Sequence, residues 1–350
     1  MFNCAKEIIG YHNDEVTLLQ SERNEMRDRR DANRKRLKKG LKDQGKPKPK
    51  EFWSQGSYAM KTMTQQPGQD YDIDDGVYFD KEDLKGSQGA YMTALAARQM
   101  VRDAIDDDSF KTPPAVCKNC VRVYYDAGYH VDIPVYRRVV NTTWWGSEEV
   151  YYELASSDWK RSDARDVTKW FDDENKRQSP DETNGRQMRR ITRLIKKYAT
   201  SRSSWKGQIG SGFMITKLVT ERYQVSANRE DEALYYTMKA IRDRLENNLI
   251  VKHPVTPDST ITKGDEDPKA RVLKEKLSDA ISWLQVLFDS DCTEEKAAKA
   301  WDKVFNTTYF TDKYKEKNKD EEKTKAFVSS VASPITTSSF TSRPTGSFGD

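Results

Sequence analysis

Two short segments alternate acidic and apolar side chains as half-buried β-strands do: YDIDDGVYF at residues 71–79 and YHVDIPVY at residues 129–136. Successive side chains of a strand point to opposite faces, so Asp72 and Asp74 share one face, roughly 6.5–7 Å apart, and the isoleucine between them points into a core. Asp132 also stands between two apolar residues and faces away from the core. If the two strands pair, three carboxylates meet on one patch of a sheet.

Three crowded carboxylates predict a metal site. Like charges held close together raise one another's pKa, and hard divalent cations with oxygen ligands relieve the repulsion. Magnesium, for which manganese can substitute, suits phosphoryl transfer by two ions about 3.5–4 Å apart. We expect Asp72 and Asp74 to bridge both ions. Asp132, on the separate strand, would hold the ion beside the attacking ribose hydroxyl and accept its proton.

A phosphate seat is expected upstream, at Gln55-Gly56-Ser57. Glycine lets a phosphate approach the backbone closely, and a serine hydroxyl with neighbouring amides can donate to its oxygens. All three residues are candidates for nucleotide binding. The competing interpretation is that the acidic stretch is a solvated turn and Gly-Ser an ordinary loop. Asp70 and Asp75 are expected to take no part in the site, and Asp75 should face away from the metals.

The surrounding sequence predicts an α+β protein. Its four expected parts are an N-terminal spine helix and linker (1–50), a catalytic core (51–155), a helical lobe that closes the nucleotide cleft (156–312) and a charged, disordered tail (313–350). Apolar and charged periodicity predicts helices at 1–40, 91–106, 186–200, 230–249, 268–289 and 293–305. The tail ends in a Ser/Thr/Pro/Gly stretch that cannot bury a core.

The composition is that of a highly solvated protein. Of 350 residues, 33% are charged, and 60 basic residues nearly balance 56 acidic ones. No stretch approaches the roughly 20 apolar residues that cross a bilayer, and the first residues lack the apolar run of a signal peptide. The four cysteines suggest no disulfide framework, and Cys117-Lys118-Asn119-Cys120 lacks the second pair of ligands that zinc needs. We expect a cytoplasmic protein with no membrane partner.

Together with QGSYAMKT at residues 55–62, the two acidic strands resemble the bacterial cGAS/DncV-like nucleotidyltransferases (CD-NTases) of CBASS anti-phage systems. The shared pattern is a GS loop, a DxD strand and a third aspartate before an apolar-Pro-x-Tyr stretch. Similarity extends to SDAR (162–165, with alanine where the family usually has proline), WF (170–171), RITRLIKKY (190–198), SGF (211–213) and, more weakly, VKHPVTPD (251–258).

This resemblance implies a polymerase-β-like mixed sheet joined to a helical, OAS-like C-terminal lobe, with nucleoside triphosphates (NTPs) in the cleft. It assigns the three aspartates to the metals and Ser57 to the GS loop, and it places Lys196 and Ser211 near the triphosphate. The implied activity joins NTPs, with release of pyrophosphate, into a cyclic di- or trinucleotide messenger in anti-phage defence. A cGAMP made from ATP and GTP is the first choice. A downstream effector would bind the product, and an E1- or E2-like protein could conjugate the C-terminal end.

One helix carries basic residues at helical spacing opposite its apolar face, namely Arg186, Arg189, Arg190, Arg193 and Lys197. A triphosphate needs such cations, so Lys197 joins Lys196 as a candidate nucleotide-binding residue. A solvated basic surface is the alternative interpretation.

Two other functions fit the same residues. An enzyme of this fold could make a linear product or modify RNA or protein. A catalytically inactive protein on the same scaffold could act as a nucleotide or RNA sensor, although a pure binder has no need of three crowded carboxylates.

Overall fold

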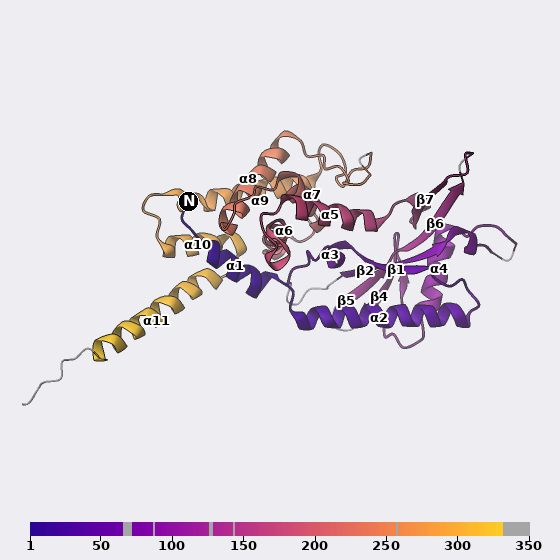
Figure 1. Ribbon diagram of the computed structural model, residues 1–350, viewed down its shortest axis with the longest axis horizontal. Coiled ribbons are helices and arrows are strands. Elements are labelled where there is room, and N and C mark those ends of the chain that lie inside the picture. The colour runs from indigo at the N-terminus through magenta and orange to yellow at the C-terminus, as the bar shows by residue number, and fades with distance from the viewer. Residues whose placement is uncertain (66–71, 87, 126–128, 143, 257, 332–350) are drawn as a thin grey trace, which may run out of the picture.

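The protein consists of a mixed β-sheet and a helical lobe (Figure 1). The computed structural model describes residues 1–65, 72–86, 88–125, 129–142, 144–256 and 258–331. The strands within these residues are β1 (Glu51–Gln55), β2 (Asp72–Asp80), β3 (Ala115–Val116), β4 (Val121–Tyr125), β5 (Tyr129–Ile133), β6 (Val135–Thr142), β7 (Glu148–Ala155) and β8 (Trp159–Arg161). The α-helices are α1 (Ala5–Tyr11), α2 (Gln20–Asp43), α3 (Gly56–Ala59), α4 (Ala94–Ile105), α5 (Ala164–Gln178), α6 (Gln187–Thr200), α7 (Gly212–Arg222), α8 (Glu230–Asn247), α9 (Pro268–Trp283), α10 (Glu294–Phe305) and α11 (Tyr309–Val331).

Strand β2 organises the sheet. The strand order is β3-β4-β5-β2-β6-β7-β8, and β1 pairs with β2 in antiparallel fashion. The start of β2 pairs in parallel with β5 and its end with β6, because Pro134 divides one long extended segment into two strands. The acidic half of β2 therefore lies against the half of that segment that carries Asp132.

Helices α2 and α4 pack on the sheet and bury its core (Figure 1). Ile73 on β2 and Val131 on β5 belong to this core and are each 1% exposed. The two helices approach closely at Gly40, where an added Cβ would lie 1.7 Å from the carbonyl oxygen of Ala104. This packing leaves the opposite face of β2 and β5 for the aspartates.

The helical lobe has its own core. Helices α1 and α6 to α10 bury apolar residues that include Ile191, Leu194 and Leu234, each 0% exposed. An aromatic cluster that includes Tyr11 and Phe305 holds the N-terminal helix against α10 and the start of α11. The first helix of the chain is thus part of the lobe formed by the last ones.

The expectation of one helix over residues 1–40 is wrong. Helix α1 continues into a π-helical turn (His12–Val16), and the chain is extended before α2 begins at Gln20. Thr17 forms a β-bridge with Thr64 at this break. The break is needed because α1 packs in the helical lobe whereas α2 packs on the sheet.

The charged segment from residue 313 is also more regular than expected. It belongs to α11, which is helical to Val331 and projects from the lobe in Figure 1. Alternating Lys and Glu at helical spacing can support such a helix, as the pair between Lys313 and Glu316 shows. The C-terminal residues 332–350, and with them the expected conjugation site, lie outside the described residues.

The expected fold class is confirmed: a mixed sheet is joined to helices that make up most of the chain after β8. Strands β7 and β8 and helices α5 and α7 were not anticipated individually. No helix in the described part of the chain combines the length and the apolar character that crossing a bilayer requires.

Candidate active site

A cavity of about 600 Å³ opens between the sheet and the helical lobe. Its sheet side is lined by Gln55, Gly56, Ser57, Asp72 and Asp74, and its helical side includes Ala164, Val167, Lys196, Phe213 and His253. The volume lies within the range of small-molecule sites. Of the candidate residues, Asp132, Lys197 and Ser211 are not among those lining the cavity.

Four polar side chains form a row across the sheet beside this cavity. Asp74 on β2 lies directly opposite Asp132 on β5, in parallel register. On either side of them, Gln55 on β1 pairs with Asp74, and Arg122 on β4 pairs with Asp132. Directly paired residues project from the same face of a sheet, so the structure brings the second and third aspartates together as expected.

The first aspartate lies at the edge of this row. Asp72 is opposite His130, and its carboxylate contacts the Nε2 atom of that ring. The hydrogen bond with Asp72 raises the pKa of His130. Asp75 projects to the other side of β2, where Arg34 binds its carboxylate at 2.5 and 2.7 Å. Asp75 therefore faces away from the cavity, as expected.

The surroundings of Asp74 oppose its ionisation. Burial, then the charges of Asp132 and Asp72, raises the pKa of Asp74 to about 6. Asp132 is held instead by two hydrogen bonds from Arg122, each 2.7 Å long. A half-buried carboxylate crowded by two others is suited to a site that a cation will occupy.

The three aspartates offer the oxygen ligands that a divalent metal prefers, but their carboxylates do not converge on one point. Within the described residues, no group of three His, Cys, Asp or Glu side chains has metal-binding geometry. Arg122 holds Asp132 and His130 contacts Asp72, so two of the three aspartates have other partners. A metal that binds Asp132 therefore competes with Arg122 for both carboxylate oxygens, and one that binds Asp72 competes with His130 for one.

The GS segment lies directly against Asp74. Gly56 begins α3 with a φ of +62°, and an added Cβ would lie only 2.2 Å from the Oδ2 atom of Asp74. No other residue type fits there without a shift of the carboxylate. Ser57 follows in the cavity wall.

The side chain of Gln55 supports the start of the GS segment. Its side-chain nitrogen donates to the Tyr78 hydroxyl at 3.0 Å, and its oxygen accepts from the Tyr136 hydroxyl at 3.1 Å. Gln55 is 3% exposed. These bonds fix the end of β1 and hence the start of the GS segment.

The cations of α6 bind the backbone that follows α3. Arg193 donates to the Lys61 carbonyl at 2.6 and 2.8 Å, and Lys197 donates to the Gln65 carbonyl at 3.0 Å. Lys196 donates to the hydroxyl of Thr62 at 2.9 Å and lines the cavity. Two members of the basic stripe, Arg193 and Lys197, therefore fix the backbone of residues 61 and 65. Lys196, which lies beside the stripe, also lines the cavity.

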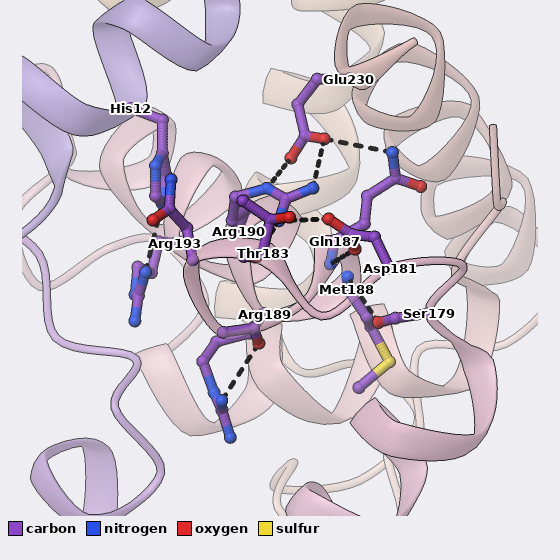
Figure 2. A network of polar contacts seen from close by, with 12 residues as sticks. His12, Ser179, Asp181, Thr183, Gln187, Met188, Arg189, Arg190, Arg193 and Glu230 are labelled. Carbon is purple, nitrogen blue, oxygen red and sulfur yellow. Dashed lines mark hydrogen bonds and ion pairs between the residues drawn. The ribbon is translucent and has the colours of Figure 1, made fainter. Parts of the chain in front are cut away.

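Figure 2 shows three members of this stripe, Arg189, Arg190 and Arg193, in a network of polar contacts. Arg190 donates to both carboxylate oxygens of Glu230, at 2.8 and 2.9 Å, and to Asp181 at 2.9 Å. Arg193 contacts His12, whose pKa falls to about 3 because of burial and then the charge of Arg193. These contacts link α6 to α8 and to the N-terminal segment.

Ser211 is placed as a helix cap. Its hydroxyl accepts from the Met214 backbone N–H at 3.2 Å at the start of α7. Neither Ser211 nor Lys197 is brought to the aspartates by a contact among the described residues.

Cys117 and Cys120 are free thiols without a metal-binding group around them in the described residues.

Sequence reasoning missed the role of Arg122. The antiparallel register of β4 and β5 pairs Arg122 with Asp132, and Val121 with Ile133. A hairpin alignment that places residues equally far from the turn opposite one another would have found this pair. Phe213 and His253 lie in segments that resemble the CD-NTase family, but the sequence did not single them out as site residues.

Comparison with known proteins identifies the sheet region. Residues 50–136 match the family model for the nucleotidyltransferase domain of cyclic GMP-AMP synthase DncV-like proteins. This stretch is a DncV-like nucleotidyltransferase domain. The family expected from the sequence is thereby confirmed, and the matched stretch contains Gly56, Ser57 and all three aspartates.

A curated relative supports the DncV-like assignment over a longer stretch. A cyclic GMP-AMP synthase of Escherichia albertii is 24% identical over 220 residues, which make up 60% of this chain. The matched region spans 45% of that relative's own length.

Solved structures share the fold of the DncV-like domain and the helical lobe. A Vibrio cholerae DncV in complex with the linear intermediate pppA(3′,5′)pG matches with a TM-score of 0.65 at 18% identity, covering 87% of this chain and 96% of that one. A Bradyrhizobium diazoefficiens CD-NTase, CdnG, in complex with GTP gives 0.64 at 14% identity, covering 90% and 98%. An Escherichia coli DncV bound to 3′-deoxy GTP gives 0.62 at 17% identity, covering 85% and 93%.

Proposed function

We propose that this protein is a divalent-metal-dependent nucleotidyltransferase that joins NTPs and closes them into a cyclic dinucleotide. The observation that carries the proposal is the register that sets Asp74 opposite Asp132, with Asp72 and the Gly56-Ser57 segment beside them. The DncV-like family match covers this arrangement.

In the proposed reaction, a ribose hydroxyl of one NTP attacks the α-phosphate of another. A bond forms between that oxygen and phosphorus, the bond to pyrophosphate breaks, and Asp132 accepts the hydroxyl proton. Magnesium bound to the three aspartates would lower the pKa of the hydroxyl and neutralise the triphosphate. A second attack, by a ribose hydroxyl of the linear product on the α-phosphate of its remaining triphosphate, closes the ring and releases a second pyrophosphate.

The chain's own residues prepare this chemistry. The Ser57 hydroxyl and nearby backbone N–H groups donate to phosphate oxygens, and Lys196 supplies a positive charge at the cavity wall. The backbone pairing of β2 with β5 sets the spacing of the two strands that carry the aspartates. We assign Arg122 the role of holding Asp132 until the metal replaces it.

The finer proposal is that ATP and GTP give a cGAMP. Its support is the naming of the curated relative as a cyclic GMP-AMP synthase and the pppA(3′,5′)pG intermediate bound to a protein of the same fold. A role in anti-phage defence, a cytoplasmic location, a downstream effector and conjugation of the C-terminus by an E1- or E2-like protein remain predictions of the family resemblance.

The test is incubation of the purified protein with labelled NTPs and Mg²⁺, followed by phosphatase and mass spectrometry. We expect pyrophosphate release and a phosphatase-resistant product, both abolished by EDTA and by Asp74→Asn combined with Asp132→Asn. The matched control is Asp80→Asn, at the opposite end of β2, where the carboxylate binds Lys50 and Arg138. A phosphatase-sensitive product would favour the linear alternative, and no metal-dependent turnover would favour a sensor.

A further inference from the structure

Two aromatic rings face the cavity on its helical side. Phe213 stands in the first turn of α7, and His253 in the segment between α8 and α9. Their ring centroids are 5.4 Å apart, and the rings are tilted by 58°. Among the described residues that line the cavity, no other side chain is aromatic.

The surroundings of His253 fix where its ring carries a hydrogen. The Nδ1 atom accepts from the backbone N–H of Thr256 at 3.2 Å and lies 2.8 Å from the hydroxyl of that residue. A backbone N–H can only donate, so Nδ1 is an acceptor and the ring hydrogen is on Nε2. Burial, with a contribution from Lys160, lowers the pKa of His253, which favours this neutral form at pH 7.

The segment that carries His253 is itself held in place. The His253 backbone N–H donates to the Ser259 carbonyl at 2.9 Å, and Lys252 forms a β-bridge with Thr260. Within the part of the chain that the structure describes, no residue is hydrogen-bonded to Nε2. The ring therefore offers the cavity a donor of fixed position that has no hydrogen-bond partner among the described residues.

We propose that Phe213 and His253 form the base-binding end of the cavity, and that the Nε2–H group of His253 donates to N7 of a purine. Bases stack on aromatic rings regardless of their identity. N7 is an acceptor that adenine and guanine share and that pyrimidines lack. His253 is thus a specificity-determining residue that favours purine NTPs over pyrimidine NTPs. This inference rests on the proposed function, because it takes the ligand to be an NTP.

The experiment compares ATP and GTP with their 7-deaza analogues, in which carbon replaces N7. Binding to the full chain is measured by calorimetry with Mg²⁺ and non-hydrolysable forms of each nucleotide. One neutral hydrogen bond corresponds to a loss of about 3–10-fold in affinity. We expect this loss for 7-deaza analogues of whichever purine nucleotides bind the unsubstituted protein.

Two substitutions separate the two ring nitrogens. His253→Asn keeps an acceptor near the position of Nδ1, for Thr256, but removes the Nε2 donor; ATP and 7-deaza-ATP should then bind equally. His253→Gln keeps an amide donor near the position of Nε2 and loses the loop contact, and it should still discriminate. Phe213→Leu should weaken both nucleotides alike, by about tenfold.

Each outcome decides between the two proposals. If neither ATP nor GTP binds the unsubstituted protein, the proposal that these two nucleotides are its substrates is wrong and the inference falls with it. If both nucleotides bind but their 7-deaza analogues bind equally well, only the role of His253 is overturned. The same holds if replacing N7 by carbon reduces affinity for the His253→Asn variant as much as for the unsubstituted protein.

Discussion

The ionisation of Asp74 is opposed by burial and by two neighbouring carboxylates, which together raise its pKa to about 6. An unfolded aspartate has a pKa of about 3.9. The stability that this shift contributes is fully present below pH 4 and is lost as the pH rises through 6. At neutral pH, the ionised Asp74 therefore lowers the free energy of unfolding of the metal-free protein by at most about 3 kcal/mol.

Replacing Asp74 by asparagine should raise the melting temperature of the metal-free protein at pH 7.5. It should also flatten the decline in stability between pH 4 and pH 6, as measured by thermal unfolding in EDTA. Asp80→Asn is the control with the opposite expected sign, because hydrogen bonds from Lys50 and Arg138 outweigh burial and lower the pKa of Asp80. A lower melting temperature for Asp74→Asn would contradict the electrostatic interpretation.

Lys196 is a second residue whose charge depends on its ligand. Burial, then the charge of Arg193, lowers its pKa to about 7. A bound triphosphate raises that pKa again, so binding at pH 7.5 should take up a proton and weaken as the pH rises towards 9. Lys196→Met should cost at least about tenfold in affinity at pH 7 and abolish the proton uptake.

Calorimetry in two buffers of different ionisation enthalpy measures that proton uptake. Lys197→Met is the matched control, because Lys197 is next in sequence but binds the Gln65 carbonyl instead of lining the cavity. Equal effects of the two substitutions would remove Lys196 from the nucleotide site.

At the scale of elements, the start of α3 is fitted to the start of β2. Gly56→Ala would place a methyl group against the Asp74 carboxylate. Gly45 has a nearly identical φ of +61° and open space around its missing Cβ, so Gly45→Ala carries the same backbone cost without the clash. We expect Gly56→Ala to reduce turnover by more than about 100-fold, whereas Gly45→Ala leaves turnover unchanged. Similar turnover in both variants would show that the contact with Asp74 is unimportant.

The ion pair between Arg190 and Glu230 joins α6 to α8 in the interior, where the two side chains are 6% and 2% exposed. Removing one partner leaves an uncompensated buried charge, so Arg190→Met should destabilise the protein by about 3–5 kcal/mol in urea unfolding. Lys169→Met breaks the exposed pair with Asp173 on α5 and should change stability by less than about 1 kcal/mol. A small effect of Arg190→Met would mean that the network in Figure 2 contributes little to stability.

Local patterns in the sequence predicted most of these elements. The alternation around Asp72, Asp74 and Asp132 predicted the paired strands, and apolar periodicity predicted α6, α8 and α10. The break after Val16 could not be predicted in this way, because its cause is the separation of two packing surfaces. The hydrogen-bond partners of the basic side chains on α6 could not be predicted for the same reason. Periodicity places a side chain on one face of a helix but does not show which residues lie opposite that face.

At the scale of the whole molecule, the site is shared between the two lobes. The sheet supplies Asp72, Asp74 and the GS segment to the cavity, with Asp132 beside Asp74. The helical lobe supplies Lys196, Phe213 and His253 to the same cavity. The sequence could place the first set, because its residues lie on neighbouring strands with a recognisable pattern. The second set depends on how the lobe packs on the sheet, which no single segment encodes.

We propose that Asp72, Asp74 and Asp132 together bind divalent metal beside the triphosphate. Crystals grown with Mn²⁺ and a non-hydrolysable NTP test it most directly, through anomalous scattering at the manganese edge. We predict manganese peaks in contact with all three carboxylates and with the triphosphate, and Arg122 withdrawn from Asp132. Manganese bound elsewhere, or Asp132 still paired with Arg122 beside a bound NTP, would contradict the account.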